Sequence, residues 1–146
     1  DAYLASRGLR TLSVRMKAHE ASALQIAKWL QTQPDVAGVF HPALPECPGH
    51  DIWKRDFSGS AGLFSFIHKG DATTAAAFVD ALELFGIGYS WGGYESLIIP
   101  FDCSTYRTVT HWNPEGPALR IQIGLEDVED LKKDLDAGFA RLRASA

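Results

Sequence analysis

The chain has little that would support disulfide, metal or nucleic-acid chemistry. Its 146 residues include only two cysteines, Cys47 and Cys103, whose separation does not match a metal-binding motif. Two isolated thiols are the default in a reducing compartment, so we expect them to be idle or buried. Acidic residues outnumber basic ones, the net charge is −4, and Lys and Arg form no cluster. A nucleic-acid partner is therefore not expected.

Long hydrophobic runs are also lacking. No apolar segment approaches the length that spans a bilayer, and no charged segment followed by an apolar one opens the chain. We therefore expect a soluble, cytoplasmic protein without a membrane partner. The chain begins at Asp1 and its single methionine is Met16, which suggests a piece cut from something longer. Its length and apolar content fit one domain with its own core.

Three stretches place apolar residues at helical spacing. The pattern predicts amphipathic helices over Leu9–Leu30, over the segment from Asp71 to Phe85, and over Glu126–Arg143. Asp71 is the expected N-cap of the second helix, and Gly86 is expected to end it.

Four short segments have the composition of strands. They are Val36–Phe40, Ala61–His68, Ser96–Pro100 and Ala118–Ile123. The second is apolar on both faces, which predicts a central strand. Interleaved helices and strands of these lengths predict an α/β fold: a small, mostly antiparallel sheet of four or five strands with helices packed on one face. The other face would be uncovered.

The segment from His41 to His50 contains three prolines and a glycine, so we expect an extended surface crossing rather than a helix or a central strand. His41 and His50 flank Cys47, which raises the possibility of zinc. However, three ligands on a flexible loop lack a fourth partner, and histidines bonded to the backbone are the better interpretation. We predict no metal site.

The segment Gly86–Leu97 is the hardest to explain by folding alone. Four glycines alternate with two tyrosines, two serines and a tryptophan, so backbone free to approach a ligand lies among flat rings and hydroxyls. It is either the wall of a ligand pocket, with Ser90 and Trp91 near its centre, or a glycine-rich turn whose aromatic residues fill the core.

The segment Ala118–Ile123 alternates, which turns Arg120 away from the core. A guanidinium fixed on a strand suits two-point capture of a carboxylate, and the alternative is a surface arginine paired with a nearby acid. No nucleophile and base are recognisable, and the acids of 126–130 are explained by the dipole at a helix start. Residues 101–117 have no periodicity and predict a long loop, in which His111 and Trp112 serve packing.

Eight segments in order resemble the C-terminal domain of the pyridoxal-phosphate enzymes of cysteine and methionine metabolism, specifically the bacterial cystathionine β-lyases. They are Ser6-Arg-Gly-Leu-Arg-Thr-Leu12, Val14-Arg-Met16, His41-Pro-Ala-Leu-Pro45, Pro48-Gly-His50, Lys54-Arg-Asp-Phe57, Gly62-Leu-Phe-Ser-Phe66, Ser90-Trp-Gly-Gly-Tyr-Glu-Ser-Leu97 and Ile123-Gly-Leu-Glu-Asp127. The resemblance covers nearly the whole chain, except for 101–118, where no family motif is matched.

This resemblance implies that residues 1–146 are the small C-terminal domain of a fold-type-I enzyme, closing over a large domain that holds pyridoxal 5′-phosphate through a Schiff-base lysine. It implies that Arg120 binds the substrate α-carboxylate, with Ser90 and Trp91 beside it. The implied reaction cleaves cystathionine to homocysteine, pyruvate and ammonia. Trp91 favours the β-lyase over cystathionine γ-synthase, γ-lyase or methionine γ-lyase, in which a smaller residue is more common.

The family's cofactor lysine, its aspartate for the pyridine nitrogen and its phosphate-binding loop have no counterpart among these residues. We therefore expect no catalytic and no cofactor-binding residue in this chain, which alone would neither bind the cofactor covalently nor turn over substrate. The resemblance implies a homotetramer for the intact enzyme. The competing hypothesis is a non-catalytic module that binds an amino acid or another protein.

Overall fold

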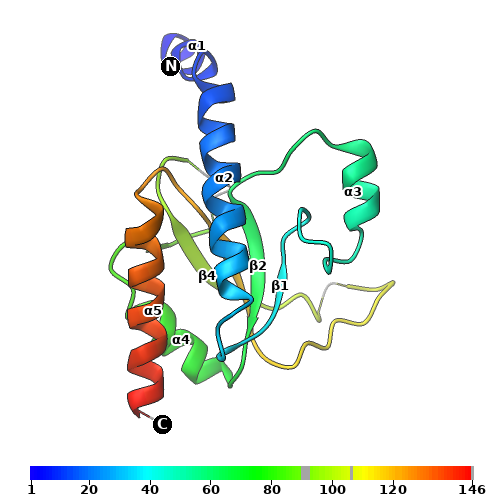
Figure 1. The fold of residues 1–146 in the computed structure, drawn as a ribbon, viewed down its shortest axis with the longest axis vertical. Coiled ribbons are helices and arrows are strands. Elements are labelled where there is room, and N and C mark those ends of the chain that lie inside the picture. Colours follow the sequence, from blue (N-terminus) through cyan, green and yellow to red (C-terminus); the bar gives the residue numbers. More distant parts are fainter. Residues whose placement is uncertain (90–92, 106, 146) are drawn as a thin grey trace.

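A computed structural model describes residues 1–89, 93–105 and 107–145. The strands are β1 (Val36–Phe40), β2 (Leu63–His68), β3 (Gly86–Ile87), β4 (Leu97–Phe101) and β5 (Ala118–Gln122). The helices are α1 (Ala2–Leu9), α2 (Leu12–Leu30), α3 (His50–Asp56), α4 (Ala72–Asp80) and α5 (Val128–Ser145). Figure 1 shows α2, α4 and α5 on one face of the sheet, with α2 and α5 side by side.

The five strands form one sheet in the order β1-β2-β5-β4-β3. The pairs β1–β2, β2–β5 and β5–β4 are antiparallel, and only the short pair β3–β4 is parallel. The predicted fold class is therefore confirmed, and β2 is central as predicted. All four predicted strands occur, with ends that differ by at most two residues.

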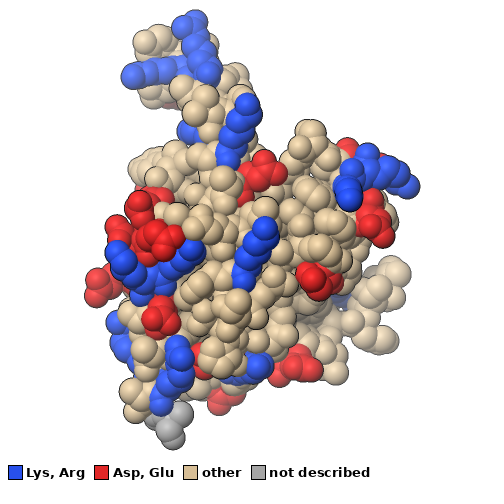
Figure 2. Space-filling view, in the orientation of Figure 1, with Lys and Arg blue, Asp and Glu red and all other residues tan. Residues whose placement is uncertain are grey.

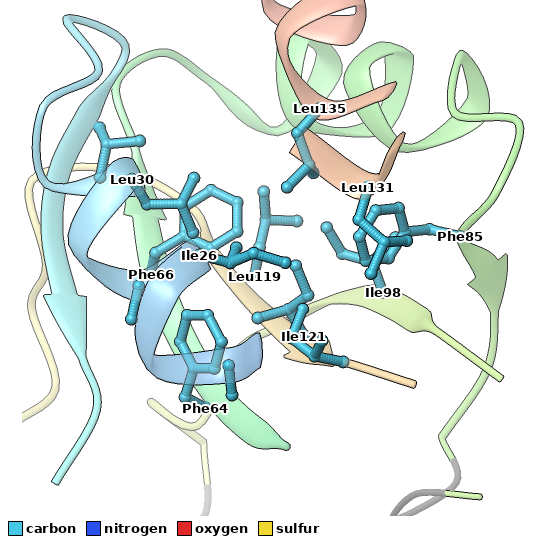
Figure 3. Close-up of a cluster of buried hydrophobic side chains, with 14 of the residues drawn as sticks. Ile26, Leu30, Phe64, Phe66, Phe85, Ile98, Leu119, Ile121, Leu131 and Leu135 are labelled. Atoms are coloured by element: carbon cyan, nitrogen blue, oxygen red, sulfur yellow. The ribbon is translucent and has the colours of Figure 1, made fainter. Parts of the chain in front are cut away.

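The core lies between the sheet and these three helices (Figure 3). Most of its largest fully buried side chains come from α2, α4, α5, β2, β4 and β5, and Leu44 and Ile123 come from the segments between elements. They include Ile26, Leu30, Phe66, Phe78, Ile98, Leu119, Ile121, Leu131, Leu135 and Phe139. Burial of each such side chain contributes about 1.5–3 kcal/mol, so this layer fixes which sheet face points outward. We call the face opposite α2, α4 and α5 the second face.

The single helix predicted over Leu9–Leu30 is wrong, because the chain forms two helices there. Thr11 has non-helical dihedral angles and separates α1 from α2. The Arg15 side chain reaches back across this break and donates to the Gly8 carbonyl at 2.8 Å. No residue of α1 is buried, and the first buried residue of α2 is His19, so α1 and the first turns of α2 project from the body (Figure 1).

The predicted surface crossing at 41–50 is also wrong in part. The segment is a series of turns that enters the interior, where His41 and Leu44 are buried. The expected backbone bonds of its histidines are confirmed: the Ala43 N–H donates to His41 Nδ1 at 3.2 Å, and His50 Nδ1 lies 2.8 Å from the Pro42 carbonyl. The segment continues into α3, a short helix without buried residues that the pattern did not predict.

Asp71 caps α4 through a reciprocal capping box, as predicted. However, α4 ends at Asp80 instead of running to Gly86. The carboxylate of Asp134, on α5, accepts the backbone N–H groups of 83 and 84 at 2.8–3.1 Å. These bonds replace further helical turns, so the glycine-rich segment begins with strand β3 and does not follow directly on a helix.

Candidate functional site

Arg120 lies in the middle of β5, between two neighbouring strands. It is paired with Ser65 of β2 and with Ile99 of β4. Leu119 and Ile121, on either side of it, are fully buried under the helices. Because strand residues alternate between faces, the half-buried Arg120 side chain lies on the second face, as predicted.

The guanidinium of Arg120 contacts Tyr89, at the start of the glycine-rich loop. Its Nη2 donates to the Tyr89 carbonyl, and its central carbon lies 5.5 Å from the centroid of the Tyr89 ring. No ion pair joins Arg120 to an acid within the described parts of the chain. A guanidinium carries five N–H groups, so the contact with Tyr89 leaves donors for a carboxylate.

The glycine-rich loop leaves and re-enters the sheet at adjacent points. β3 runs parallel to β4, and the Gly86 N–H donates to the Ser96 carbonyl at 3.0 Å. Arg120 contacts the first part of this loop at Tyr89. Two of the three predicted site residues, Ser90 and Trp91, lie outside the described residues, and their roles stay predictions.

Glu126 is a residue of this region that sequence reasoning assigned wrongly. It lies two positions before α5, and its carboxylate accepts two hydrogen bonds from Ser96 at 2.8 Å each. Asp127 instead stabilises the start of α5, where its carboxylate accepts the N–H of Glu129 at 2.9 Å. The sequence offered no signal for this contact, because the acids 126–130 look alike in a local pattern.

Part of the second face is covered by the described residues of the predicted long loop, 102–105 and 107–117. The ring of Trp112 lies 6.0 Å from that of Phe40 on β1 and 6.1 Å from that of Phe101 on β4. The guanidinium of Arg107 lies 5.1 Å from the Trp112 ring centroid. The predicted packing role is confirmed for Trp112 but wrong for His111, which is exposed, and the expectation of a wholly uncovered face is also wrong.

The buried histidines serve packing instead of chemistry. His41 lies against Phe64 with ring centroids 5.4 Å apart, and His68 stacks on Phe78 at 6.0 Å. Burial lowers the pKa of both imidazoles below the usual value, which keeps them neutral near pH 7. Burial likewise raises the pKa of the Cys47 thiol, so it lacks the lowered pKa of a reactive cysteine.

The described residues have the features of neither a metal site nor a membrane-spanning helix. They contain no cluster of three or more histidine, cysteine, aspartate or glutamate side chains able to hold a metal ion. None of their helices has the length and apolarity needed to cross a membrane. Positive and negative side chains are interspersed on the face that Figure 2 shows.

The lysines do not fit the role of a cofactor-binding amine. That role needs a desolvated amine whose pKa is lowered by its surroundings. Lys132 bonds to Glu129 at 2.8 Å and Lys133 to Asp130 at 2.8 Å, which raises the pKa of the Lys133 amine. The others, Lys17, Lys28, Lys54 and Lys69, are exposed. A cofactor held as a Schiff base therefore does not match the lysines of this chain.

The fold is that of a domain found in pyridoxal-phosphate enzymes of fold type I. A solved cystathionine γ-synthase from Xanthomonas oryzae, in complex with aminoacrylate and cysteine, superposes with a TM-score of 0.83. It is 36% identical to this chain, and the match covers 100% of this chain and 39% of that one.

The chain belongs to the family of Cys/Met metabolism PLP-dependent enzymes, whose model matches residues 1–140. Pyridoxal phosphate (PLP) is thus the cofactor of its family. Cystathionine β-lyase MetC of Escherichia coli is 51% identical over 97% of this chain. An L-alanine/L-glutamate racemase of Wolbachia pipientis is 46% identical over 97% of it. The chain spans 37% and 36% of the lengths of these two relatives.

Proposed function

We propose that the chain is the C-terminal, substrate-carboxylate-binding domain of a PLP-dependent carbon–sulfur β-lyase of the cytoplasm. The complete enzyme would cleave cystathionine to homocysteine, pyruvate and ammonia. The observation that carries this proposal is the position of Arg120. Its guanidinium extends from β5 on the second face and is hydrogen-bonded to a carbonyl instead of an acid. The 51% identity to the Escherichia coli β-lyase supports the choice of reaction.

Arg120 would bind and orient the substrate. Its backbone is held by hydrogen-bonded strands on both sides, so the side chain starts from a fixed position. Two parallel N–H···O bonds to an α-carboxylate would fix both the distance and the plane of the amino acid. Such orientation lowers the entropic part of a barrier without any bond-making by the arginine. Ser90 and Trp91 would line the same pocket.

The cofactor chemistry would come from a second domain. Pyridoxal phosphate supplies an electron sink for carbanions at the substrate α-carbon. Exposed apolar side chains on this chain support the proposal that another polypeptide packs against it. On the projecting α1, Tyr3, Leu4 and Leu9 are each at least 65% exposed. A cavity of about 680 Å³ lined mainly by apolar groups also lies open beside α3, with Ile52 and Phe57 on its wall. We propose that an N-terminal PLP-binding domain covers this surface and that the complete enzyme is a tetramer.

Two alternative functions fit the same site. Relatives include a γ-synthase and a racemase, and each class acts on amino acids, so the carboxylate contact alone does not select the reaction. A non-catalytic amino-acid-binding module would use Arg120 in the same way and would need no lysine. The poor fit of the lysines to a cofactor site is expected both for this module and for a domain whose cofactor is held by a second domain, so the experiment must separate the two.

The test begins with the native polypeptide, detected in source cells with an antibody against residues 1–146. A species several-fold larger than 16.0 kDa supports the lyase domain, and its purified form should release pyruvate from cystathionine. A large species that binds pyridoxal phosphate but leaves cystathionine intact would contradict the β-lyase. A native species of 16.0 kDa would favour the module, and amino-acid binding would then be measured by calorimetry.

A further inference from the structure

Three residues tie the end of the glycine-rich loop to the segment after β5. The Glu126 carboxylate accepts the backbone N–H and the hydroxyl of Ser96, each at 2.8 Å. The Ser96 Oγ in turn accepts the backbone N–H of Gly124 at 2.8 Å. Ser96 is only 1% exposed, its bond from the Gly124 N–H is buried, and its two bonds to the half-buried Glu126 are partly buried. We call Ser96, Gly124 and Glu126 the loop anchor.

The anchor is specific for this pair of segments. Both oxygens of Glu126 are directed at one serine, and the serine hydroxyl donates once and accepts once. The Leu125 N–H adds a bond to the Tyr94 carbonyl at 2.8 Å. Charged acceptors form hydrogen bonds about twice as strong as neutral ones, so Glu126 is the strongest member of the set.

Arg120 on β5 and the anchor in the segment after β5 contact the same loop. β5 carries Arg120 and leads directly to Gly124, about 13 Å further on at the rise of an extended chain. The loop runs from Tyr89, which contacts Arg120, to Ser96, which contacts Glu126. Release of the anchor would free the returning half of the loop while β5 stays in place.

We propose that Glu126 is a positioning residue for the substrate carboxylate. Through Ser96, whose carbonyl also accepts the Gly86 N–H, it fixes the two described ends of the loop, 88–89 and 93–95, and so holds Tyr89 beside Arg120 before substrate arrives. Without the anchor, binding must also order the loop, and ordering costs affinity. This inference rests on the proposed role of Arg120 in binding the substrate. It predicts an effect on the capture of substrate that is larger than any effect on its conversion.

The test uses the complete PLP-loaded enzyme that contains residues 1–146, with L-cystathionine as substrate. Glu126→Ala should raise KM at least about tenfold, while kcat stays within about threefold, because the anchor does not touch the reacting bonds. Glu126→Gln keeps an acceptor for the Ser96 N–H and should recover most of the affinity. Asp130→Ala, which removes an exposed carboxylate of α5, is the matched control and should leave both constants unchanged.

A double-mutant cycle with Arg120→Ala separates this inference from the proposed function. If Glu126 acts through the carboxylate site, Glu126→Ala should raise KM much less in the Arg120→Ala background. An unchanged KM in Arg120→Ala alone would reject the role of Arg120. A normal Arg120 effect combined with an unchanged KM in Glu126→Ala, or with fully additive effects, would reject the anchor.

A structural readout covers the case in which Glu126→Ala fails to fold. Hydrogen exchange of the backbone amides of 94–97 in the 146-residue chain should quicken in Ser96→Ala, which loses the hydroxyl bonds of the anchor, and much less in Glu126→Gln, while β2 stays protected. Uniform quickening over the whole sheet, or none at 94–97, would contradict a local positioning role.

Discussion

The guanidinium of Arg120 lies over the ring of Tyr89 and donates a hydrogen bond to the Tyr89 carbonyl, although 31 residues separate the two in sequence. The carbonyl and the ring together hold the guanidinium on the second face. A cation over an exposed ring gains about 0.5–1 kcal/mol, which is too little to compete with a carboxylate that accepts two charge-assisted bonds. The contact thus orients Arg120 without blocking it.

Replacement of Arg120 tests the carboxylate site. In the complete enzyme, Arg120→Ala should cost about 2–3 kcal/mol of substrate binding, which is a rise of about 30- to 150-fold in KM. The absorbance of the bound cofactor should not change, because the arginine is proposed to bind substrate alone. Steady-state kinetics and the visible spectrum of the same preparation give both readouts.

Arg120→Lys is the informative companion variant. A single ammonium keeps the charge but cannot make two parallel bonds to a carboxylate, so affinity should be only partly restored. Full activity in the lysine variant would mean that charge alone matters and that the proposed two-point contact is wrong.

Gly124 should tolerate no side chain. A Cβ there would lie 2.3 Å from Glu126 Oε2 and 2.4 Å from the Tyr94 carbonyl oxygen. Gly124→Ala must displace the backbone of the loop, and we expect a loss of about 1–3 kcal/mol in the free energy of unfolding. Urea unfolding of the 146-residue chain measures this. Gly38→Ala, in β1, meets no atom within 4 Å and is the matched control; equal losses in both variants would contradict the steric explanation.

The sequence predicted those features that depend on local alternation. Apolar residues on every second position of 118–123 identified both β5 and the face of Arg120, because a strand allows only two faces. Short segments of apolar composition located β1, β2 and β4. The family resemblance then supplied the role of Arg120, which alternation cannot provide.

Features that depend on contacts between distant segments were missed. The early end of α4 results from Asp134, some fifty residues away, and an apolar stripe that includes Phe85 gives no hint of it. Glu126 looked like one of several acids at a helix start, and its bond to Ser96 appears only when β4 and β5 pair. The burial of His41 likewise follows from tertiary packing, which overrides a proline-rich composition typical of surface loops.

Asp134 should be one of the stabilising side chains of the chain. Its carboxylate is 9% exposed and accepts the N–H groups of Glu83 and Leu84. Asp134→Ala leaves these donors without an acceptor and should lower the free energy of unfolding by about 3 kcal/mol. Asp136→Ala, at an exposed site on the same helix, should change it by less than about 0.5 kcal/mol. A small effect at position 134 in chemical denaturation would show that water replaces the carboxylate.

His68 should make stability depend on pH. Burial lowers the pKa of its imidazole in the folded chain, against smaller opposing effects of Asp35 and Asp71. The folded state then binds the proton less readily than the unfolded state does. The stability from neutral His68 is therefore complete above the unfolded pKa near 6.5 and is lost as the pH falls below it.

His68→Phe should remove this contribution while keeping the stacking on Phe78, since the side chain is 2% exposed and its Nδ1 has no hydrogen-bond partner. Free energies of unfolding at about pH 7.5 and about pH 5.5 should differ less in His68→Phe than in the natural chain. His111→Phe, at an exposed position, should leave the difference unchanged. If the natural chain and His68→Phe lose equal stability on acidification, the proton is taken up elsewhere, and His41, whose pKa burial also lowers, becomes the next residue to replace.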